Sequence, residues 1–529
     1  MTRTGPIDLD RLDLDGIRTG DLRDRPVTVL GLARSGLALA RFLADAGARV
    51  TVYDGRAAAD LGEAIAALGG RPVTLALGPE TDPATTWAGA ELVATSPSIS
   101  PDYPTTEPRL RAALRALVDA RAGGDPTVPA LVSEAELFLR LCPSPTIGVT
   151  GTKGKTTTSS LAAALLAADP AHPVVLGGNI GIPMVERLLA LTPAHRVVDE
   201  LSELQLPTLS RGTTVAVYTN VTSDHLDRHG SLAGYQRVKR RLAELVDPDG
   251  ALILNDEDPI VASYGAATSA RTIRYRRDRP SAGGLGLVEG WIVADGVERL
   301  ALAGGGVAAT GPAGRIMPVA ELAIPGAHNV SNALAAVGAA LAFGVAPDAI
   351  RAAAAAFTGV EHRLEAVGLI DGVRFVNDSQ GTQPDAVEAA LRAFEPPIVL
   401  IAGGRDKGID LAALAPVVAE RAVAAVLIGE SGPTLEASFR AAGLARTERA
   451  VDLDDAVRRA DAIARETLRS APSGGRPSAG PATVLLSPAA ASFDMFVDYA
   501  DRGRAFKASV AALAAARADA RSDEPGGDR

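Results

Sequence analysis

Residues 146–160 read TIGVTGTKGKTTTSS, and the rest of the chain is organised around this stretch. Ile147 and Val149 predict a buried strand, the glycines after them predict a turn, and the apolar run SSLAAALLAA predicts a helix. At such a junction, backbone N–H groups and the positive end of the helix dipole converge on one point, where Lys155 adds a full charge. Thr156 follows that lysine, at the usual position of a Mg²⁺-binding hydroxyl. The stretch therefore predicts a nucleoside triphosphate site.

The loop is a variant of the phosphate-binding pattern. A strict P-loop has a glycine five places before its final Gly-Lys pair, and this chain has Val149 there. Its glycines are instead Gly148, Gly151 and Gly154. The alternative is a plain connection between a strand and a helix, but two lysines and three threonines are poor choices for such a turn. We therefore favour the triphosphate site.

The composition indicates a large globular protein. A chain of 529 residues exceeds one hydrophobic core and suggests about three domains. Its net charge of −10 argues against nucleic acid or an anionic membrane as a bulk partner, although a few local cations can still bind small anions. The single cysteine, Cys142, excludes an internal disulfide and is typical of a reducing cytosol.

The sequence carries no sign of targeting to a membrane. The residues before Val27 are polar and acidic, unlike a signal peptide. No apolar run approaches the roughly 20 residues that a membrane span requires. We therefore expect a soluble, cytoplasmic protein.

Residues 27–54 read as strand, turn, helix and strand, with the turn GLARSG at residues 31–36. This is the dinucleotide-binding fingerprint with alanine at its middle glycine, and Asp54 ends the second strand, where an acid can bind a ribose hydroxyl. The pattern favours an NAD site. The methyl group of Ala33 hinders close approach to a pyrophosphate, so a purely structural turn is the alternative.

Two later strands deliver polar residues to the ligand-binding edge of a predicted α/β sheet. The stretch VVLGGNIGIP (174–183) carries Asn179 in a glycine turn, which suits a ligand-facing amide or a plain left-handed turn. The stretch RVVDELSELQL (196–206) carries Glu200, on the edge where open α/β sheets bind ligands. A carboxylate there is a natural Mg²⁺ ligand or water-positioning group, with an acid at a helix N-terminus as the alternative.

A dense polar cluster follows the predicted strand TTVAVYTNV (213–221). It contains two of the six histidines, His225 among them, and two aspartates. Metal coordination is one interpretation and a capped loop is the other. In the helical stretch 235–245, Lys239 belongs by default to a solvated basic face.

The second half of the chain continues the α/β pattern. Residues 274–320 predict β-hairpins on the surface or a loosely ordered insertion. Asn329 lies at the entrance of an alanine-rich helix, where asparagine usually caps. From Phe357 onward, alternating strands and helices predict a mostly parallel sheet. Residues 516–529 are polar and predicted to be disordered.

Nine motifs occur in one order along the chain: GVTGTKGKTTT, GGNIGIP, ELSELQL, NVTSDHLDRHG, IPGAHNVSNALAA, FTGVEHRLE, VNDSQGT, AGGRDKG and LLSPAAASFDMFVDYADRG. This ordered set resembles the Mur ligase family. The resemblance implies three α/β domains: a Rossmann-like UDP-substrate domain (1–130), a central P-loop-type ATPase domain (131–356) and a Rossmann-like glutamate domain (357–515). It replaces the NAD interpretation of GLARSG and explains the alanine there.

The resemblance also implies roles in binding ATP and Mg²⁺. Lys155, Glu200, His225 and Lys239 would form the catalytic set, with Thr156 and Glu200 on Mg²⁺ and His225 on a second metal. Lys239 falls where the family has a carbamylated lysine, in which CO₂ addition turns an ammonium into an anionic metal ligand. The implied ATP contacts are Gly151, Thr152, Lys153, Gly154, Lys155, Thr156, Thr157, Asn329, Arg363 and Asp378.

Two further groups of residues are implied for the other substrates. The contacts to the UDP substrate would be Leu32, Ala33, Arg34, Asp54, Ser98 and Asn179. The contacts to glutamate would be Thr382, Lys407, Ser492 and Tyr499. Three positions depart from the family pattern: Gln380 replaces a usual lysine in members that add D-glutamate, Ser98 replaces a usual glycine, and Lys153 replaces a frequent asparagine.

The implied reaction is an ATP-dependent amide ligation in peptidoglycan precursor synthesis, carried out by a monomer. ATP would phosphorylate the carboxylate of UDP-N-acetylmuramoyl-L-alanine, and the amine of glutamate, D-glutamate favoured, would attack the acyl phosphate. The alternatives are a member that adds L-glutamate and a ligase like folylpolyglutamate synthase. From another class, an NAD-dependent oxidoreductase would rest on GLARSG and Asp54 alone.

Overall fold

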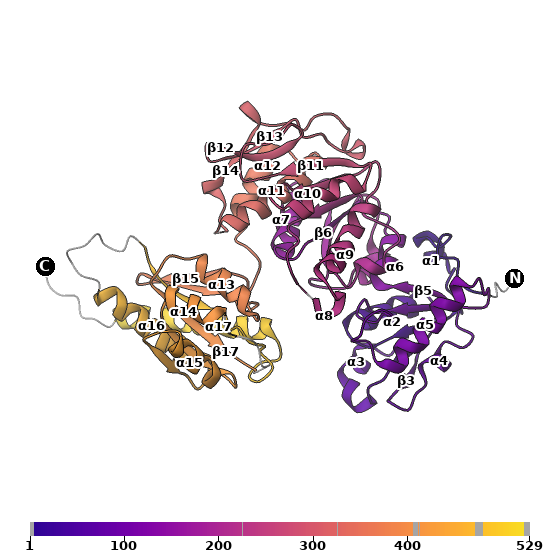
Figure 1. Ribbon diagram of the computed structural model, residues 1–529, viewed down its shortest axis with the longest axis horizontal. Helices are drawn as coiled ribbons and strands as arrows, with labels where there is room; N and C mark the ends of the chain where they lie inside the picture. Colours follow the sequence, from indigo (N-terminus) through magenta and orange to yellow (C-terminus); the bar gives the residue numbers. More distant parts are fainter. Residues whose placement is uncertain are drawn as a thin grey trace. The chain divides into compact units, whose positions relative to one another are not determined.

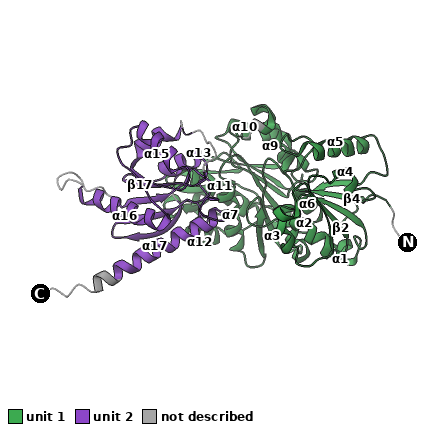
Figure 2. Ribbon diagram, turned by 90° about the horizontal axis from the view of Figure 1, so that it is seen from below, with its two compact units in different colours: residues 1–323, 327–357 green, residues 324–326, 358–529 purple. Residues whose placement is uncertain are grey.

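The computed structural model describes residues 5–224, 226–324, 326–405, 411, 413–470 and 480–522. This part of the chain forms three sheets flanked by helices (Figure 1). It divides into two compact units, which Figure 2 shows in separate colours. The first unit (residues 1–323 and 327–357) holds two sheets, and the second (residues 324–326 and 358–529) holds the third. The predicted α/β class and the predicted sheet in each third of the chain are confirmed.

The first sheet is parallel throughout, in the order β3-β2-β1-β4-β5. This is a doubly wound arrangement, and the GLARSG turn lies where the strand order reverses after β1. The strands are β1 (Pro26–Leu30), β2 (Arg49–Asp54), β3 (Val73–Leu77), β4 (Leu92–Thr95) and β5 (Ala130–Ser133). The helices around them are α1 (Leu14–Thr19), α2 (Arg34–Asp45), α3 (Gly62–Ala67), α4 (Pro83–Thr86) and α5 (Pro108–Ala122).

The end of the first sheet differs from the prediction. The sequence of Ala130–Cys142 predicts a helix and a linker into the central domain, but the stretch begins instead with β5, whose residues pair with β4. Helix α6 (Glu134–Leu141) starts only after Ser133, whose hydroxyl accepts a hydrogen bond from the N–H of Glu136 at 3.1 Å. This is an N-cap, which satisfies one of the unpaired N–H groups of a helix start. The first sheet therefore extends past the predicted boundary at residue 130.

The second sheet has nine strands in the order β14-β13-β12-β11-β10-β9-β6-β8-β7. Neighbours from β7 to β12 run parallel, whereas β12, β13 and β14 are antiparallel. The hairpins predicted within residues 274–320 are thus present, and they extend the central sheet. The strands are β6 (Thr146–Thr150), β7 (Val174–Gly178), β8 (Arg196–Glu200), β9 (Val215–Tyr218), β10 (Ala251–Asn255), β11 (Arg271–Tyr275), β12 (Gly284–Val288), β13 (Trp291–Asp295) and β14 (Arg315–Pro318). The helices are α7 (Lys155–Ala167), α8 (Leu226–His229), α9 (Leu232–Leu245), α10 (Pro259–Ser263), α11 (Ala327–Ala342) and α12 (Pro347–Ala356).

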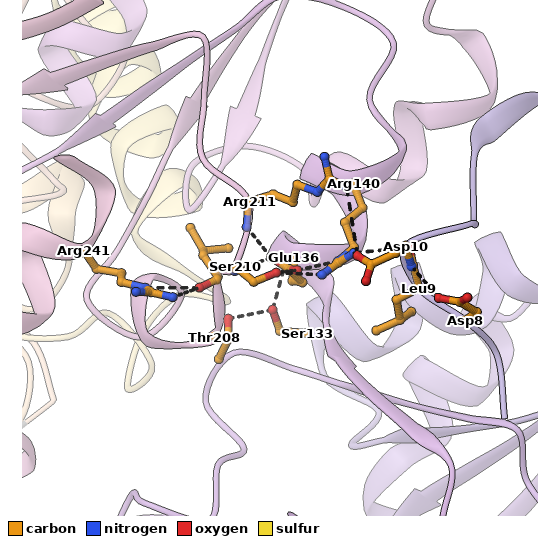
Figure 3. A network of polar contacts seen from close by, with 11 residues as sticks. Asp8, Leu9, Asp10, Ser133, Glu136, Arg140, Thr208, Ser210, Arg211 and Arg241 are labelled. Carbon is orange, nitrogen blue, oxygen red and sulfur yellow. Dashed lines mark hydrogen bonds and ion pairs between the residues drawn. The ribbon is translucent and has the colours of Figure 1, made fainter. Parts of the chain in front are cut away.

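The two sheets of the first unit are joined by helix α6 and its polar contacts (Figure 3). The carboxylate of Glu136 accepts hydrogen bonds from the backbone N–H groups of Ser210 at 2.8 Å and Arg211 at 3.3 Å. One turn later, Arg140 donates to the carbonyl oxygen of Leu9 at 3.2 Å and to the carboxylate of Asp10 at 2.8 Å. Helix α6 therefore ties the N-terminal segment to a loop of the central sheet.

The second unit contains a sheet in the order β15-β16-β20-β17-β18-β19. All of its neighbours are parallel except β15, which forms an antiparallel pair with β16. The strands are β15 (Glu365–Ile370), β16 (Val373–Asn377), β17 (Ile398–Gly403), β18 (Ala422–Ile428), β19 (Thr447–Arg449) and β20 (Ala482–Leu486). The helices are α13 (Pro384–Arg392), α14 (Leu414–Arg421), α15 (Gly432–Ala441), α16 (Leu453–Ser470) and α17 (Tyr499–Ser522).

The predicted disorder from residue 516 is wrong for the first residues of that segment. Helix α17 runs to Ser522, and Arg517 forms ion pairs with Asp371 at 3.2 Å and with Asp461. These ion pairs join the helix to α16 and to the β15–β16 turn, an interaction that a polar composition does not reveal. No helix within the described stretches is both long and apolar enough to cross a membrane.

Candidate functional site

The loop between β6 and α7 has the geometry of a phosphate cradle. Gly151 and Gly154 adopt φ angles of 147° and 83°, in the region that favours glycine. A Cβ atom on Gly151 would lie 2.0 Å from the hydroxyl oxygen of Thr219, and one on Gly154 would lie 2.5 Å from a side-chain oxygen of Asn332. These two positions therefore have room only for glycine, and the loop between them leads directly into the start of α7, where the N–H groups of the first turn are available.

Neighbouring strand ends hold this loop in place. The N–H of Thr152 donates to the carbonyl oxygen of Asn220 at 2.7 Å, and the N–H of Lys153 donates to the Asn220 side chain at 2.9 Å. The ammonium of Lys155 donates back to the carbonyl oxygens of Gly151 at 3.1 Å and Thr152 at 2.8 Å. Lys155 thus lies along the loop at the positive end of α7. Sequence analysis missed Asn220, whose only signal was its place after a buried strand.

Glu200 lies beside the phosphate loop. It ends β8, and its backbone is in register with Val149 of β6. The side chain is buried, with one carboxylate oxygen accepting a hydrogen bond from the Asn179 amide at 2.9 Å. The other oxygen, Oε2, is buried and has no hydrogen-bond partner among the described residues. A buried carboxylate oxygen needs a partner, so the site suits a cation. Because Glu200 ends a strand, the alternative of an acid at a helix N-terminus is wrong.

Lys239 is completely buried on α9, so the predicted solvated basic face is wrong for this residue. Its ammonium nitrogen donates to the hydroxyl of Thr150, at the start of the phosphate loop, at 3.2 Å and lies 5.5 Å from the ring centre of Tyr235. Burial, followed by the charge of Lys155, lowers the pKa of Lys239 to about 7. A substantial fraction of this side chain is therefore a neutral amine near pH 7.

Only some of the metal ligands predicted from the sequence are among the residues that the structure describes. Thr156 lies in the first turn of α7 and is buried, whereas His225 lies outside the described residues. Within those residues no group of three His, Cys, Asp or Glu side chains converges to hold a metal. A cation here would therefore rely on one carboxylate, a hydroxyl and oxygen ligands from its substrate or water, as Mg²⁺ commonly does.

Asn329 is the third residue of α11, so its interpretation as the helix cap is wrong. It is buried, and its side-chain oxygen accepts a hydrogen bond from the amide of Asn332 at 3.0 Å. The Asn332 oxygen in turn accepts a hydrogen bond from the hydroxyl of Thr158 on α7 at 3.2 Å. The two asparagines are three residues apart on one helix face, and this spacing was the signal for Asn332.

The GLARSG turn is braced by Asp54. The Asp54 carboxylate accepts a hydrogen bond from the backbone N–H of Leu32 at 2.8 Å and from the Arg56 side chain. Although burial opposes ionisation, hydrogen bonds from Arg56 and Leu32 lower the pKa of Asp54 below its ordinary value. A Cβ atom on Gly36 would lie 1.8 Å from the carbonyl oxygen of Gly31, so glycine is required for the helix to pack on the strand.

The other residues predicted around the UDP substrate lie in the same unit. Ala33 and Ser98 are exposed, whereas Leu32 is buried. The Arg34 guanidinium donates to the carbonyl oxygens of Asn179 at 3.1 Å and Gly181 at 3.3 Å. Arg34 therefore links the turn after β1 to the loop after β7, and Asn179 links that loop to Glu200.

Glu134, the first residue of α6, is hydrogen-bonded to the segment that follows the loop after β7. Its carboxylate is buried and accepts a hydrogen bond from the N–H of Val185 at 3.2 Å. Burial raises the pKa of Glu134 from 4.5 to about 7. Because the folded form binds the proton more tightly, this group's contribution to stability is complete below pH 4.5 and falls as the pH rises through about 7.

We predict that Glu134→Gln reduces the loss of stability at high pH. Relative to wild type, the unfolding free energy of the variant should be higher at pH 8 than at pH 5 by up to about 3 kcal/mol. Urea unfolding followed by tryptophan fluorescence measures this, because Trp87 and Trp291 both lie in the first unit. Glu63→Gln, at an exposed position, is the matched control. A shift of the same size in both variants would contradict the role of Glu134.

In the second unit, Asp378 lies at the carboxyl end of β16. One carboxylate oxygen accepts a hydrogen bond from the Ser487 hydroxyl at 2.6 Å and the other from the N–H of Leu364 at 3.2 Å. Burial raises the pKa of Asp378 to about 6, against the opposing charge of Arg363. The structure therefore brings together the predicted pair Arg363 and Asp378.

Three of the residues predicted to contact glutamate lie at this same edge, two on loops and one at the start of a helix. Ser492 is buried, Thr382 is partly exposed and Tyr499 is 42 % exposed at the start of α17. The Ser379 hydroxyl donates to the carbonyl oxygen of Tyr499 at 2.7 Å, which joins the loop of Thr382 to the start of α17. Lys407, the fourth predicted contact, lies outside the described residues.

Comparison with known proteins identifies the family. The model of the Mur ligase middle domain matches residues 149–340, and that of the Mur ligase glutamate ligase domain matches residues 362–470. A UDP-N-acetylmuramoylalanine–D-glutamate ligase of Symbiobacterium thermophilum is 38 % identical over 487 residues, covering 92 % of this chain and 97 % of the relative. The chain belongs to the Mur ligase family. The resemblance inferred from the ordered motifs is confirmed.

Two further relatives of this Mur ligase carry the same name. The enzyme of Pelotomaculum thermopropionicum is 37 % identical, covering 93 % of this chain and 99 % of the relative. The enzyme of Acidobacterium capsulatum is 38 % identical, covering 93 % and 97 % of the two chains. The similarity therefore spans nearly the whole of each protein, including the first sheet, which neither domain model covers.

Proposed function

We propose that this Mur ligase joins D-glutamate to UDP-N-acetylmuramoyl-L-alanine at the expense of ATP. The observation that carries the proposal is the phosphate loop with Lys155 beside the buried, half-partnered carboxylate of Glu200. Relatives with the corresponding name match more than nine-tenths of the chain. The reaction would belong to cytoplasmic peptidoglycan precursor synthesis, with the chain acting as a monomer.

In this proposal the first unit binds and activates ATP. Gly154 and the first turn of α7 would offer N–H groups to the phosphates, because Asn220 already accepts those of Thr152 and Lys153. Lys155 would turn from its loop carbonyls to the transferred phosphoryl group. Thr156 and Glu200 would hold Mg²⁺, with His225 at a second metal. When bound, Mg²⁺ supplies charge neutralisation for the phosphoryl group. Thr157 and Asn329 complete this group of ATP contacts in the first unit.

The remaining predicted residues would select the other two substrates. The residues of the first sheet and the loop after β7 would bind the UDP substrate, namely Leu32, Ala33, Arg34, Asp54, Ser98 and Asn179. Arg363 and Asp378 remain the ATP contacts that the family resemblance implies for the remainder of the chain. The second unit would hold glutamate through Thr382, Lys407, Ser492 and Tyr499. Gln380 carries no charge, so recognition of the glutamate carboxylates would depend more heavily on the neighbouring hydroxyls and Lys407.

One assay tests the proposed function. Phosphate release from ATP is measured with UDP-N-acetylmuramoyl-L-alanine and each glutamate enantiomer, and the product is identified by mass. We expect turnover with D-glutamate and none with L-glutamate. Preferred turnover with L-glutamate, or with a folate substrate in place of the UDP compound, would support the alternative ligases instead. Saturable quenching in an NADH titration would favour the oxidoreductase.

Lys239 provides a separate prediction about a modified side chain. Its neutral amine can add to CO₂ and release one proton, forming a carbamate whose oxygens would ligate a metal. In ¹³C-bicarbonate we expect a carbamate carbon resonance that is lost in Lys239→Met, together with a fall in activity of about 100-fold. Arg240→Met is the matched control, because this neighbour on α9 is exposed and pairs with Glu244 at 3.2 Å. An unchanged resonance in Lys239→Met would refute the assignment.

A further inference from the structure

The second unit contains a fully buried arginine, Arg502, in the first turn of α17. Its guanidinium donates to the hydroxyl and the carbonyl oxygen of Ser379, both at 2.9 Å, and twice to the carbonyl oxygen of Ala490 at 3.2 Å. A further N–H donates to the carbonyl oxygen of Gly403 at 3.4 Å. Burial lowers the pKa of Arg502 to about 10, so the group keeps its charge near neutral pH.

These acceptors lie at the end of one strand and in the loops that follow two others. Ser379 follows β16, Gly403 ends β17 and Ala490 follows β20, and these three strands are parallel neighbours. The carboxyl ends of parallel strands meet at one edge of a sheet, which is where open α/β sheets bind ligands. Arg502 therefore forms hydrogen bonds at the carboxyl ends of all three strands and joins the segments that follow them.

Arginine is the residue type that this geometry requires. Its five N–H groups form a rigid planar fork, so one side chain can satisfy carbonyl oxygens on several loops at once. Burying a full charge is costly unless it is well hydrogen-bonded. A lysine would keep the charge but has only three donors on a flexible stem, and it could not hold the same three loops in one arrangement.

The loops held by Arg502 carry the amino-acid contacts of the proposed function. Thr382 follows Ser379 in the first loop, Ser492 lies in the loop after β20, and Tyr499 begins α17, the helix that carries Arg502 itself. Direct contacts between the loops reinforce the spacing: the N–H of Ala489 donates to the carbonyl oxygen of Gly381 at 2.9 Å. Ala489 adopts a φ of 54°, a strained angle for alanine that the surrounding contacts must maintain.

We propose that Arg502 is a positioning residue for the amino-acid substrate. It sets the distances among Thr382 on one loop, Ser492 on another and Tyr499 at the start of α17, without itself touching the substrate. This inference rests on the proposed function, because it assumes that these loops bind the incoming amino acid. Loss of the Arg502 guanidinium should therefore weaken amino-acid binding more than ATP binding.

The test compares Michaelis constants for the two substrates in Arg502→Lys. Loss of hydrogen bonds from a charged group should raise KM for the amino acid by about tenfold or more, while KM for ATP changes by less than about threefold. The control is Arg421→Met, which removes another arginine of the same unit; Arg421 donates to the carbonyl oxygen of Phe394 at 2.8 Å, before β17 begins. The control should leave both constants unchanged.

Two results would overturn the role of Arg502: an unchanged KM for the amino acid, or a fall in kcat alone that follows a lower melting temperature. If Arg502→Lys does not fold, Ser379→Ala removes one acceptor and keeps the arginine, and a rise in the same KM alone is expected. An unchanged KM in Ser379→Ala would then count against the proposal. Absence of wild-type turnover with either glutamate enantiomer would overturn the proposed function itself.

Discussion

Replacing Lys155 with alanine is expected to reduce kcat/KM for ATP by about 10³-fold or more. Lys155 is the first residue of α7, and its ammonium lies against the carbonyl oxygens of Gly151 and Thr152. The substitution removes a full positive charge from the first residue of the helix, where in the proposed function charge would develop on the transferred phosphoryl group. Initial rates of phosphate release at varied ATP, with the amino acid saturating, measure the effect.

Lys153→Ala is the graded comparison for Lys155→Ala. Lys153 belongs to the same loop, but its side chain is exposed, so solvent screens its charge. We expect a loss at least tenfold smaller than that of Lys155→Ala. Near wild-type turnover in Lys155→Ala, with correct folding shown by an unchanged melting temperature, would mean that the triphosphate binds elsewhere.

Glu200→Gln is expected to cause the second large effect, a fall in kcat of about 100-fold or more with a higher Mg²⁺ requirement. The glutamine oxygen can still accept the hydrogen bond from Asn179, so the change removes the charge and keeps the shape. The unpartnered oxygen Oε2 is then replaced by an amide nitrogen, which repels a cation. Rates measured across a Mg²⁺ titration at fixed ATP give both quantities.

Asp199→Asn is the matched control for Glu200→Gln. Asp199 is the preceding residue of β8, so its side chain points to the opposite face of the sheet. Burial raises the pKa of Asp199 well above its ordinary value, so the control changes a buried acid of the same strand that faces away from the Glu200 carboxylate. We expect an unchanged Mg²⁺ requirement. Equal shifts in both variants would indicate that general damage to β8, rather than a lost metal ligand, causes the effect.

Local sequence patterns predicted the strands, turns and helices at the carboxyl ends of the sheets, where the candidate site residues lie. The strand, glycine turn and helix around Lys155 were predicted because a buried strand, left-handed glycines and an apolar helix each leave a short-range signature. The same reasoning placed Glu200 at a strand end. The order of the motifs then indicated the family, which the comparisons confirm.

Predictions that depended on burial were less successful. Lys239 lies among arginines in a stretch that reads as a solvated helix face, yet its side chain is completely buried against Thr150. Asn329 read as a cap, yet it lies inside α11 and bonds Asn332. Residues 130–133 read as helix, yet β4 offers them a strand partner. For Lys239 and residues 130–133 a contact from a distant part of the chain decided the outcome, whereas for Asn329 it was the point at which the helix begins.

The sequence by itself therefore determined the alternation of strands and helices, the phosphate loop and the family, because these depend on residues close together in the chain. Only the tertiary structure decided which charged groups are buried and which loops they join. Arg502 illustrates the reason: its acceptors lie 12, 99 and 123 residues away, and no local pattern records how the strands bring them together.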